Sequence, residues 1–109
     1  MPKKTRRREG IVVREHHLLL QPIVNCLRHH GARPAWEIEE ELAKLFHVTQ
    51  AERRLIHPES RCPVWRNDVA FGLNRLVQER TILNVGKRQA PPGYGGVRSI
   101  YQLPQLDAA

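Results

Sequence analysis

The stretch that decides the fold is residues 61–80, RCPVWRNDVAFGLNRLVQER. Its apolar residues recur at intervals of about four, and Trp65, Val69 and Leu73 fall on one stripe. Apolar residues at this spacing are typical of an amphipathic helix. The pattern therefore predicts a helix over residues 64–80 whose apolar stripe packs on a core.

The opposite side of this helix carries hydrogen-bonding side chains and one aromatic ring. They are Asn67, Phe71, Asn74, Arg75 and Gln78, with Arg61 and Arg66 at or just before the N-terminal end. In the DNA major groove, arginine matches the acceptors of guanine, and asparagine or glutamine match adenine. Each residue alone is equally explained as solvated surface, and Arg75 is placed to pair with Glu79. As a set, they favour a face that reads DNA.

Three helical patterns precede this stretch. The first, over residues 15–30, is interrupted by Pro22, so the helix is either kinked or begins afresh with proline in its first turn. The second covers residues 35–46, and its run of glutamates predicts a solvated face near the helix N-terminus. Thr49 and Glu52 then have the spacing of a capping box, which starts a short third helix.

After residue 80 the apolar period shortens towards two. Residues 81–85 and 97–103 are rich in β-branched and aromatic residues, which predicts two strands. The glycines and prolines of residues 86–96 predict an exposed hairpin loop between them. We expect Lys87, Arg88 and Arg98, on a basic wing over residues 86–98, to contact the DNA backbone. The element order predicts a mainly α fold with a small β-hairpin, that is, an α+β winged helix-turn-helix.

Charge is distributed unevenly along the 109 residues. The formal net charge of +7 divides into +4 over residues 1–10, −1 over residues 11–60 and +4 over residues 61–109. Such a basic chain suggests a polyanionic partner, and double-stranded DNA is the partner we expect. The length suits one domain, which we place at residues 14–104, after a flexible basic arm (1–13) and before a loose tail (105–109).

Other functional classes find little support in the sequence. The six histidines and two cysteines lack the spacing of metal ligands, and no catalytic or phosphate-binding motif is present. No apolar run reaches the roughly 20 residues that a membrane helix needs, and the basic N-terminus lacks a signal-peptide core. We therefore expect a non-enzymatic protein without cofactor, membrane contact or metal, located in the cytoplasm and associated with the nucleoid.

Residues 18–103 resemble the N-terminal winged-helix domain of Mrr-type restriction-system proteins. The matching segments are LLLQPIVNCLRHHG, EIEEELAKLFHVTQAER, HPES followed by WRNDVAFGLNRLVQERTI, and GVRSIYQL. The resemblance implies a DNA-binding domain, usually joined in that family to a nuclease domain that cleaves modified DNA. This chain differs by lacking the nuclease domain, by a longer wing, and by Gly72 where that family tends to have alanine.

The resemblance also suggests that the domain could recognise methylated bases in DNA. Winged helices that recognise methylated adenine surround the methyl group with aromatic and apolar side chains, and Trp65 and Phe71 are the candidates here. Trp65 also fits the apolar stripe, which would place it in the core, and Phe71 could pack against the wing. Two alternatives stay open: a winged helix that binds protein, including a nuclease partner, and a transcriptional regulator.

Overall fold

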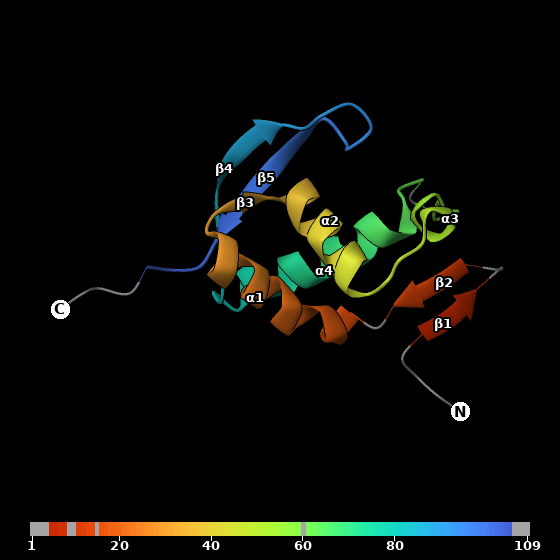
Figure 1. Ribbon diagram of the computed structural model, residues 1–109, viewed down its shortest axis with the longest axis horizontal. Helices are drawn as coiled ribbons and strands as arrows, with labels where there is room; N and C mark the ends of the chain where they lie inside the picture. The colour runs from red at the N-terminus through yellow and green to blue at the C-terminus, as the bar shows by residue number, and fades with distance from the viewer. Residues whose placement is uncertain (1–4, 9–10, 15, 60, 106–109) are drawn as a thin grey trace.

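The computed structural model describes residues 5–8, 11–14, 16–59 and 61–105. This part of the chain forms an α+β fold in which helices pack beside a small antiparallel sheet (Figure 1). A short 3-10 helix, η1 (His16–Leu19), leads into the first of four α-helices. The four are α1 (Leu20–His30), α2 (Ala35–Leu45), α3 (Gln50–Arg53) and α4 (Val64–Gln78).

The sheet has three strands in the order β3–β5–β4. They are β3 (Arg33–Pro34), β4 (Leu83–Gln89) and β5 (Val97–Gln102), and both pairings are antiparallel. Strand β4 runs four residues further than the sequence predicted, so the hairpin loop is confined to residues 90–96. A register shift between Asn84 and Gly86 lets the strand continue through the glycine. Strand β3 was not predicted, because two residues are too short to show a period.

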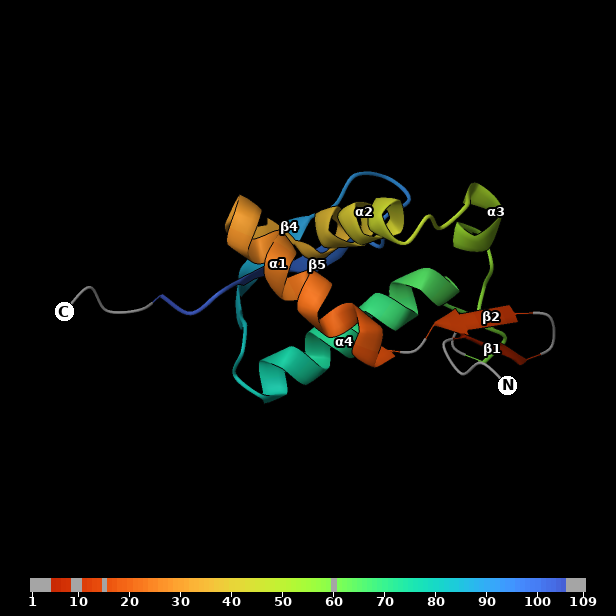
Figure 2. The same cartoon turned by 60° about the horizontal axis from the view of Figure 1, so that its bottom comes forward.

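Helices α1, α2 and α4 contact one another in pairs and enclose the core (Figure 2). Ile23, Ile38, Leu42 and Leu73 are almost completely buried there. Gly72 lies where α4 meets α1, and a Cβ atom built on it would stand 3.0 Å from Cδ1 of Ile23. The glycine therefore permits the close approach of the two helices.

The helix ends follow local signals, with one exception. Helix α1 begins with Pro22 in its first turn, which is one of the two alternatives left open by the sequence. The capping box of Thr49 and Glu52 is confirmed. Helix α4, however, ends at Gln78 rather than at residue 80. Arg80 adopts a left-handed φ of 63°, and the amide of Thr81 donates to the carbonyl of Leu76 at 2.9 Å, a helix-ending geometry usually built on glycine.

The N-terminal segment differs from the flexible arm that was predicted. Strand β1 (Thr5–Arg8) pairs antiparallel with β2 (Ile11–Arg14), and β2 contacts α4. The β-branched run of residues 11–13 favours extended backbone, and the prediction gave more weight to the repulsion among basic residues. Residues 1–4, 9–10 and 106–109 lie outside the described part, and the expected domain limits stay a prediction.

Substituting Gly72 by valine tests the close contact of α1 and α4. The added atoms would enter the side chain of Ile23, so we expect the free energy of unfolding to fall by about 1–3 kcal/mol. Chemical denaturation of both proteins measures this. Ala70→Val, at a half-buried position of the same helix, adds a β-branched side chain away from that contact. Equal losses in the two variants would contradict the proposed role of Gly72.

Candidate nucleic-acid interface

The outer stripe of α4 faces solvent as the sequence predicted. Asn74, Arg75 and Gln78 are exposed, the ring of Phe71 is 53% exposed, and Asn67 is half-buried. These five positions follow one another at helical spacing, so they form one continuous face, here called the α4 outer face. The α4 outer face therefore presents donors and acceptors on a rigid element.

Arg75 has a nearby acid on the same helix. Its Nε lies 3.1 Å from a carboxylate oxygen of Glu79, and both side chains are about half exposed. Exposed pairs of this kind are worth roughly 0–1 kcal/mol. An anionic ligand can therefore recruit Arg75 at little cost.

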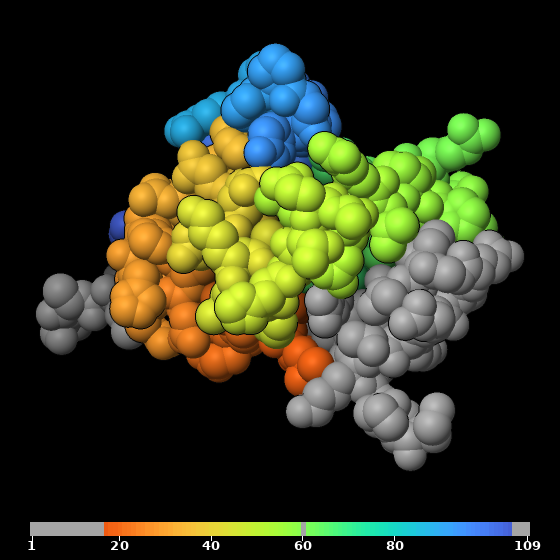
Figure 3. Space-filling view, turned by 45° about the vertical axis from the view of Figure 1, so that its right-hand side comes forward, coloured from red at the N-terminus to blue at the C-terminus, as the bar shows by residue number. Residues whose placement is uncertain are grey.

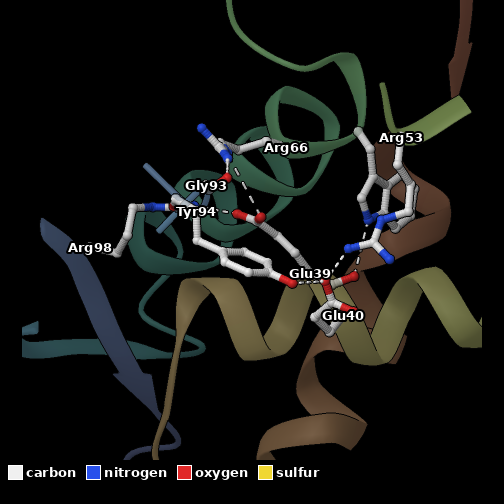
Figure 4. Close-up of polar contacts among 8 residues, drawn as sticks. Glu39, Glu40, Arg53, Arg66, Gly93, Tyr94 and Arg98 are labelled. Carbon is white, nitrogen blue, oxygen red and sulfur yellow. Dashed lines mark hydrogen bonds and ion pairs between the residues drawn. The ribbon is translucent and has the colours of Figure 1, made fainter. Parts of the chain in front are cut away.

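The other expected basic contacts divide into two groups. Arg61, Lys87 and Arg88 are exposed, the first in the loop before α4 and the other two on β4. Arg66 and Arg98 instead point towards the acidic helix α2 (Figure 4). We expected both of these arginines to contact DNA, and this structure places them in an internal ion-pair network.

Glu39 of α2 is the centre of that network. Its side chain is buried, and its carboxylate accepts from Arg98 of β5, while the second oxygen lies 3.8 Å from Nε of Arg66. At 3.8 Å the contact with Arg66 is an ion pair, too long for a hydrogen bond. The backbone carbonyl of Glu39 also accepts from Nε1 of Trp65 over 3.0 Å. One glutamate thus joins α2 to α4 and to β5.

Glu40, the next residue, binds the tip of the hairpin. Its carboxylate accepts from the hydroxyl of Tyr94 over 2.8 Å and from the guanidinium of Arg53 in α3 (Figure 4). The carbonyl of Gly93 accepts from Arg66 over 3.1 Å, and that of Tyr94 accepts from Arg98. Figure 3 shows the hairpin tip lying directly on the surface of α2. The loop between β4 and β5 is therefore folded back on the domain.

The acidic helix was expected to be a solvated face, and this is correct only in part. Glu37 and Glu41 are exposed, whereas Glu39 is buried. Glu39 shares the helical face of Ile38 and Leu42, so its position relative to the apolar residues is the signal that could have revealed its burial. Its partners lie 27 and 59 residues further along the chain, beyond the reach of any local pattern.

Trp65 does not reach the surface. The residue is 5% exposed, and its ring lies 6.3 Å from that of Phe46, between ring centroids. The burial follows from the apolar stripe of α4, where the sequence also placed the residue. In this structure Trp65 is not available for contact with a modified base, and of the two candidates only Phe71 is exposed.

The two glutamates differ in their pKa values. Burial raises the pKa of Glu39, and this effect outweighs the hydrogen bond and charge of Arg98 and the charge of Arg66. Partial burial acts in the same direction on Glu40, but hydrogen bonds from Arg53 and Tyr94 together outweigh it. The pKa of Glu40 therefore lies below its ordinary value of 4.5.

A polar cleft of about 390 Å³ opens beside this network, between α2, α3, the start of α4 and the hairpin tip. Its walls include Glu40, Arg53, Arg54, Pro63, Arg66 and Tyr94. Both acids that line it already accept hydrogen bonds from arginine or tyrosine. The cleft therefore borders the contact between α2 and the hairpin tip.

Among residues 5–8, 11–14, 16–59 and 61–105, no three histidine, cysteine or acidic side chains approach closely enough to hold a metal ion. None of the helices in this part combines the length and the apolar character that crossing a bilayer requires. Comparison with known proteins finds no matching family model, no matching curated protein and no matching solved structure. The resemblance to Mrr-type domains stays a prediction.

Replacing Glu40 by glutamine tests the link between α2 and the hairpin tip. Since the folded-state pKa of Glu40 is lowered, its ionised form contributes stability above pH 4.5, and this contribution is lost as the pH falls through the folded-state pKa. We expect the variant to lose about 0.5–1 kcal/mol near neutral pH, and the difference from wild type to shrink below pH 4.5.

Thermal unfolding between pH 3 and pH 7 measures this difference. Glu41→Gln is the matched control, because Glu41 is the exposed neighbour of Glu40 on the same helix. A stability difference that is constant over the whole pH range would contradict the assignment.

Proposed function

We propose that this chain is a winged-helix module that binds double-stranded DNA. The α4 outer face lies in the major groove, and Lys87 and Arg88 on β4, with Arg61 before α4, contact phosphates. The exposed row of asparagine, arginine and glutamine on α4 carries the proposal, because these are the side chains that pair with base edges.

The topology supports this proposal. Helices α2, α3 and α4 precede a β-hairpin, and strand β3, between α1 and α2, pairs with the second strand of that hairpin. A helix that carries exposed polar groups and is followed by a hairpin is the arrangement of a winged helix. The net charge of +7 favours a polyanion as the partner.

The contact surface is smaller than the sequence suggested. Arg66 and Arg98 are engaged with Glu39 and are left out of the proposed contacts. The remaining cations, Arg61, Arg75, Lys87 and Arg88, are exposed and can each neutralise a phosphate. Added salt weakens binding that depends on such contacts. In a plot of the logarithm of the binding constant against the logarithm of the salt concentration, each phosphate contact contributes a slope of about −0.9.

Simultaneous replacement of Asn74, Arg75 and Gln78 by alanine tests the α4 outer face. We expect the affinity for duplex DNA to fall at least tenfold, because each good side-chain–base pair discriminates by about 1–3 kcal/mol. Fluorescence anisotropy with a labelled duplex, repeated at several salt concentrations, measures the loss and the salt slope.

Helix α1 offers a closely matched control. Gln21, Asn25 and Arg28 are the same three residue types, are exposed, and also lie along one side of a helix. Their replacement by alanine should change the affinity less than twofold. Equal losses in both triple variants would contradict the proposal, as would a wild-type chain that fails to bind at low salt. In that case, a partner protein that binds the wild type but not the α4 triple variant in a pull-down would favour the protein-binding alternative.

We further propose that Phe71 contacts a methylated base, because its ring is exposed among the polar groups of the α4 outer face. The expected result is tighter binding to a duplex containing methylated adenine than to the same duplex without it. Phe71→Ala should abolish that preference, since the methyl group would lose its apolar contact. Leu45→Ala, which truncates an exposed apolar residue of α2, is the control. Identical affinities of the wild type for both duplexes would exclude the reading of methylated adenine by this face.

A further inference from the structure

Ala90, at the base of the hairpin tip (residues 90–96), is buried, and the rest of the tip is attached to the domain through polar contacts. Pro91, Pro92 and Gly93 are exposed, and the tip is fixed by the contacts of Gly93 and Tyr94 with Arg66, Arg98 and Glu40. Polar contacts of this type can be exchanged for contacts with another anion, whereas a buried apolar anchor cannot. The attachment is therefore chemically suited to competition.

The backbone of the hairpin tip lies close to the side chains of Arg66 and Arg98 at Gly95. Gly95 has a φ of 98°, and a Cβ built on it would stand 3.0 Å from Nη1 of Arg66 and 3.3 Å from Cδ of Arg98. A side chain at this position would be strained by the positive φ and would require both arginine side chains to shift by a few tenths of an ångström. The glycine thus lets the loop lie on the guanidinium of Arg66 while the same arginine faces Glu39 (Figure 4).

The arginines held in this way belong to the two elements of the proposed DNA-binding surface. Arg66 is in the first turn of α4, and Arg98 is in β5 of the hairpin. Only 22% and 14% of their side chains are exposed, and a single carboxylate faces both. A phosphate offers guanidinium groups the same kind of anionic oxygen that Glu39 offers.

We infer that Glu39 closes the hairpin tip over α2 and withholds Arg66 and Arg98 from DNA, and thereby sets the affinity and salt dependence of duplex binding. The inference rests on the proposed function. In the closed form, Glu39 occupies the groups that a backbone phosphate would otherwise engage. When the tip opens, the two arginines become available and the positive surface grows.

Glu39→Gln tests the inference with a nearly isosteric change. The variant keeps the packing of α2 but removes the charge that faces both arginines. We expect its affinity for a duplex to rise about five- to tenfold near 0.1 M salt, and its salt slope to steepen by about one to two, since each released arginine that contacts a phosphate adds about 0.9. Glu41→Gln removes the same charge from an exposed position of the same helix and should change the affinity less than twofold.

Two outcomes of the binding experiment overturn the inference. Equal gains for Glu39→Gln and Glu41→Gln would mean that only net charge matters. Weaker binding by a folded Glu39→Gln variant would mean that the closed tip is itself the binding form. Tyr94→Phe, which removes the hydroxyl bound to Glu40 without touching the core, should give a smaller gain in affinity. No gain in this variant would also count against the inference.

Limited proteolysis measures whether the hairpin tip is closed in the absence of DNA. Trypsin cleaves after arginine, and the side chain of Arg98 is held by Glu39, whereas that of Arg88 is exposed. Cleavage after Arg98, relative to Arg88, should be faster in Glu39→Gln and Tyr94→Phe than in wild type or Glu41→Gln. Unchanged cleavage would overturn closure by Glu39. A wild type that binds no duplex would refute the proposed function, and the tryptic rates alone would then decide whether the tip is closed.

Discussion

The buried carboxylate of Glu39 is the interaction on which the arrangement of this domain depends. It brings together α2, α4 and β5, three elements that are distant in sequence, because Arg66 and Arg98 both face it. Its backbone carbonyl accepts a hydrogen bond from Trp65, which fixes the start of α4 against α2. Burial of a carboxylate is costly unless it is paired, so removing either arginine would leave a destabilising charge. This group therefore helps to fix the position of the hairpin relative to the helices, together with the β3–β5 pairing and the hydrogen bond between Tyr94 and Glu40.

The same interaction divides the cations of the domain into two classes. Arg66 and Arg98 share the carboxylate of Glu39 inside the fold, while Arg75, Lys87 and Arg88 are exposed. A count of basic residues in the sequence cannot separate these classes, although only exposed cations contribute to the first encounter with DNA. The proposed function therefore rests on the α4 outer face and on the exposed cations Lys87 and Arg88 of β4. The hairpin tip is better described as part of the domain than as a free wing.

Local patterns predicted the α-helices and the β4–β5 hairpin, but not β1, β2 or β3. The period of the apolar residues located α4, and the spacing of Thr49 and Glu52 located the start of α3, because both signals act within one or two helical turns. The end of α4 was misjudged because Arg80 adopts the left-handed geometry that normally requires glycine. The site was predicted less completely. The α4 outer face followed from helical geometry, and the helical position of Glu39 beside Ile38 and Leu42 could have revealed its burial. The partners of Glu39 lie on two later elements, and no local pattern encodes them.

The most direct test of this account is a map of duplex binding by two-dimensional NMR of the isotopically labelled full chain. A short duplex should shift the backbone amide signals of the α4 outer face and of Lys87 and Arg88. Shifts confined to the hairpin tip and α2, or the absence of shifts at any duplex concentration, would contradict the account.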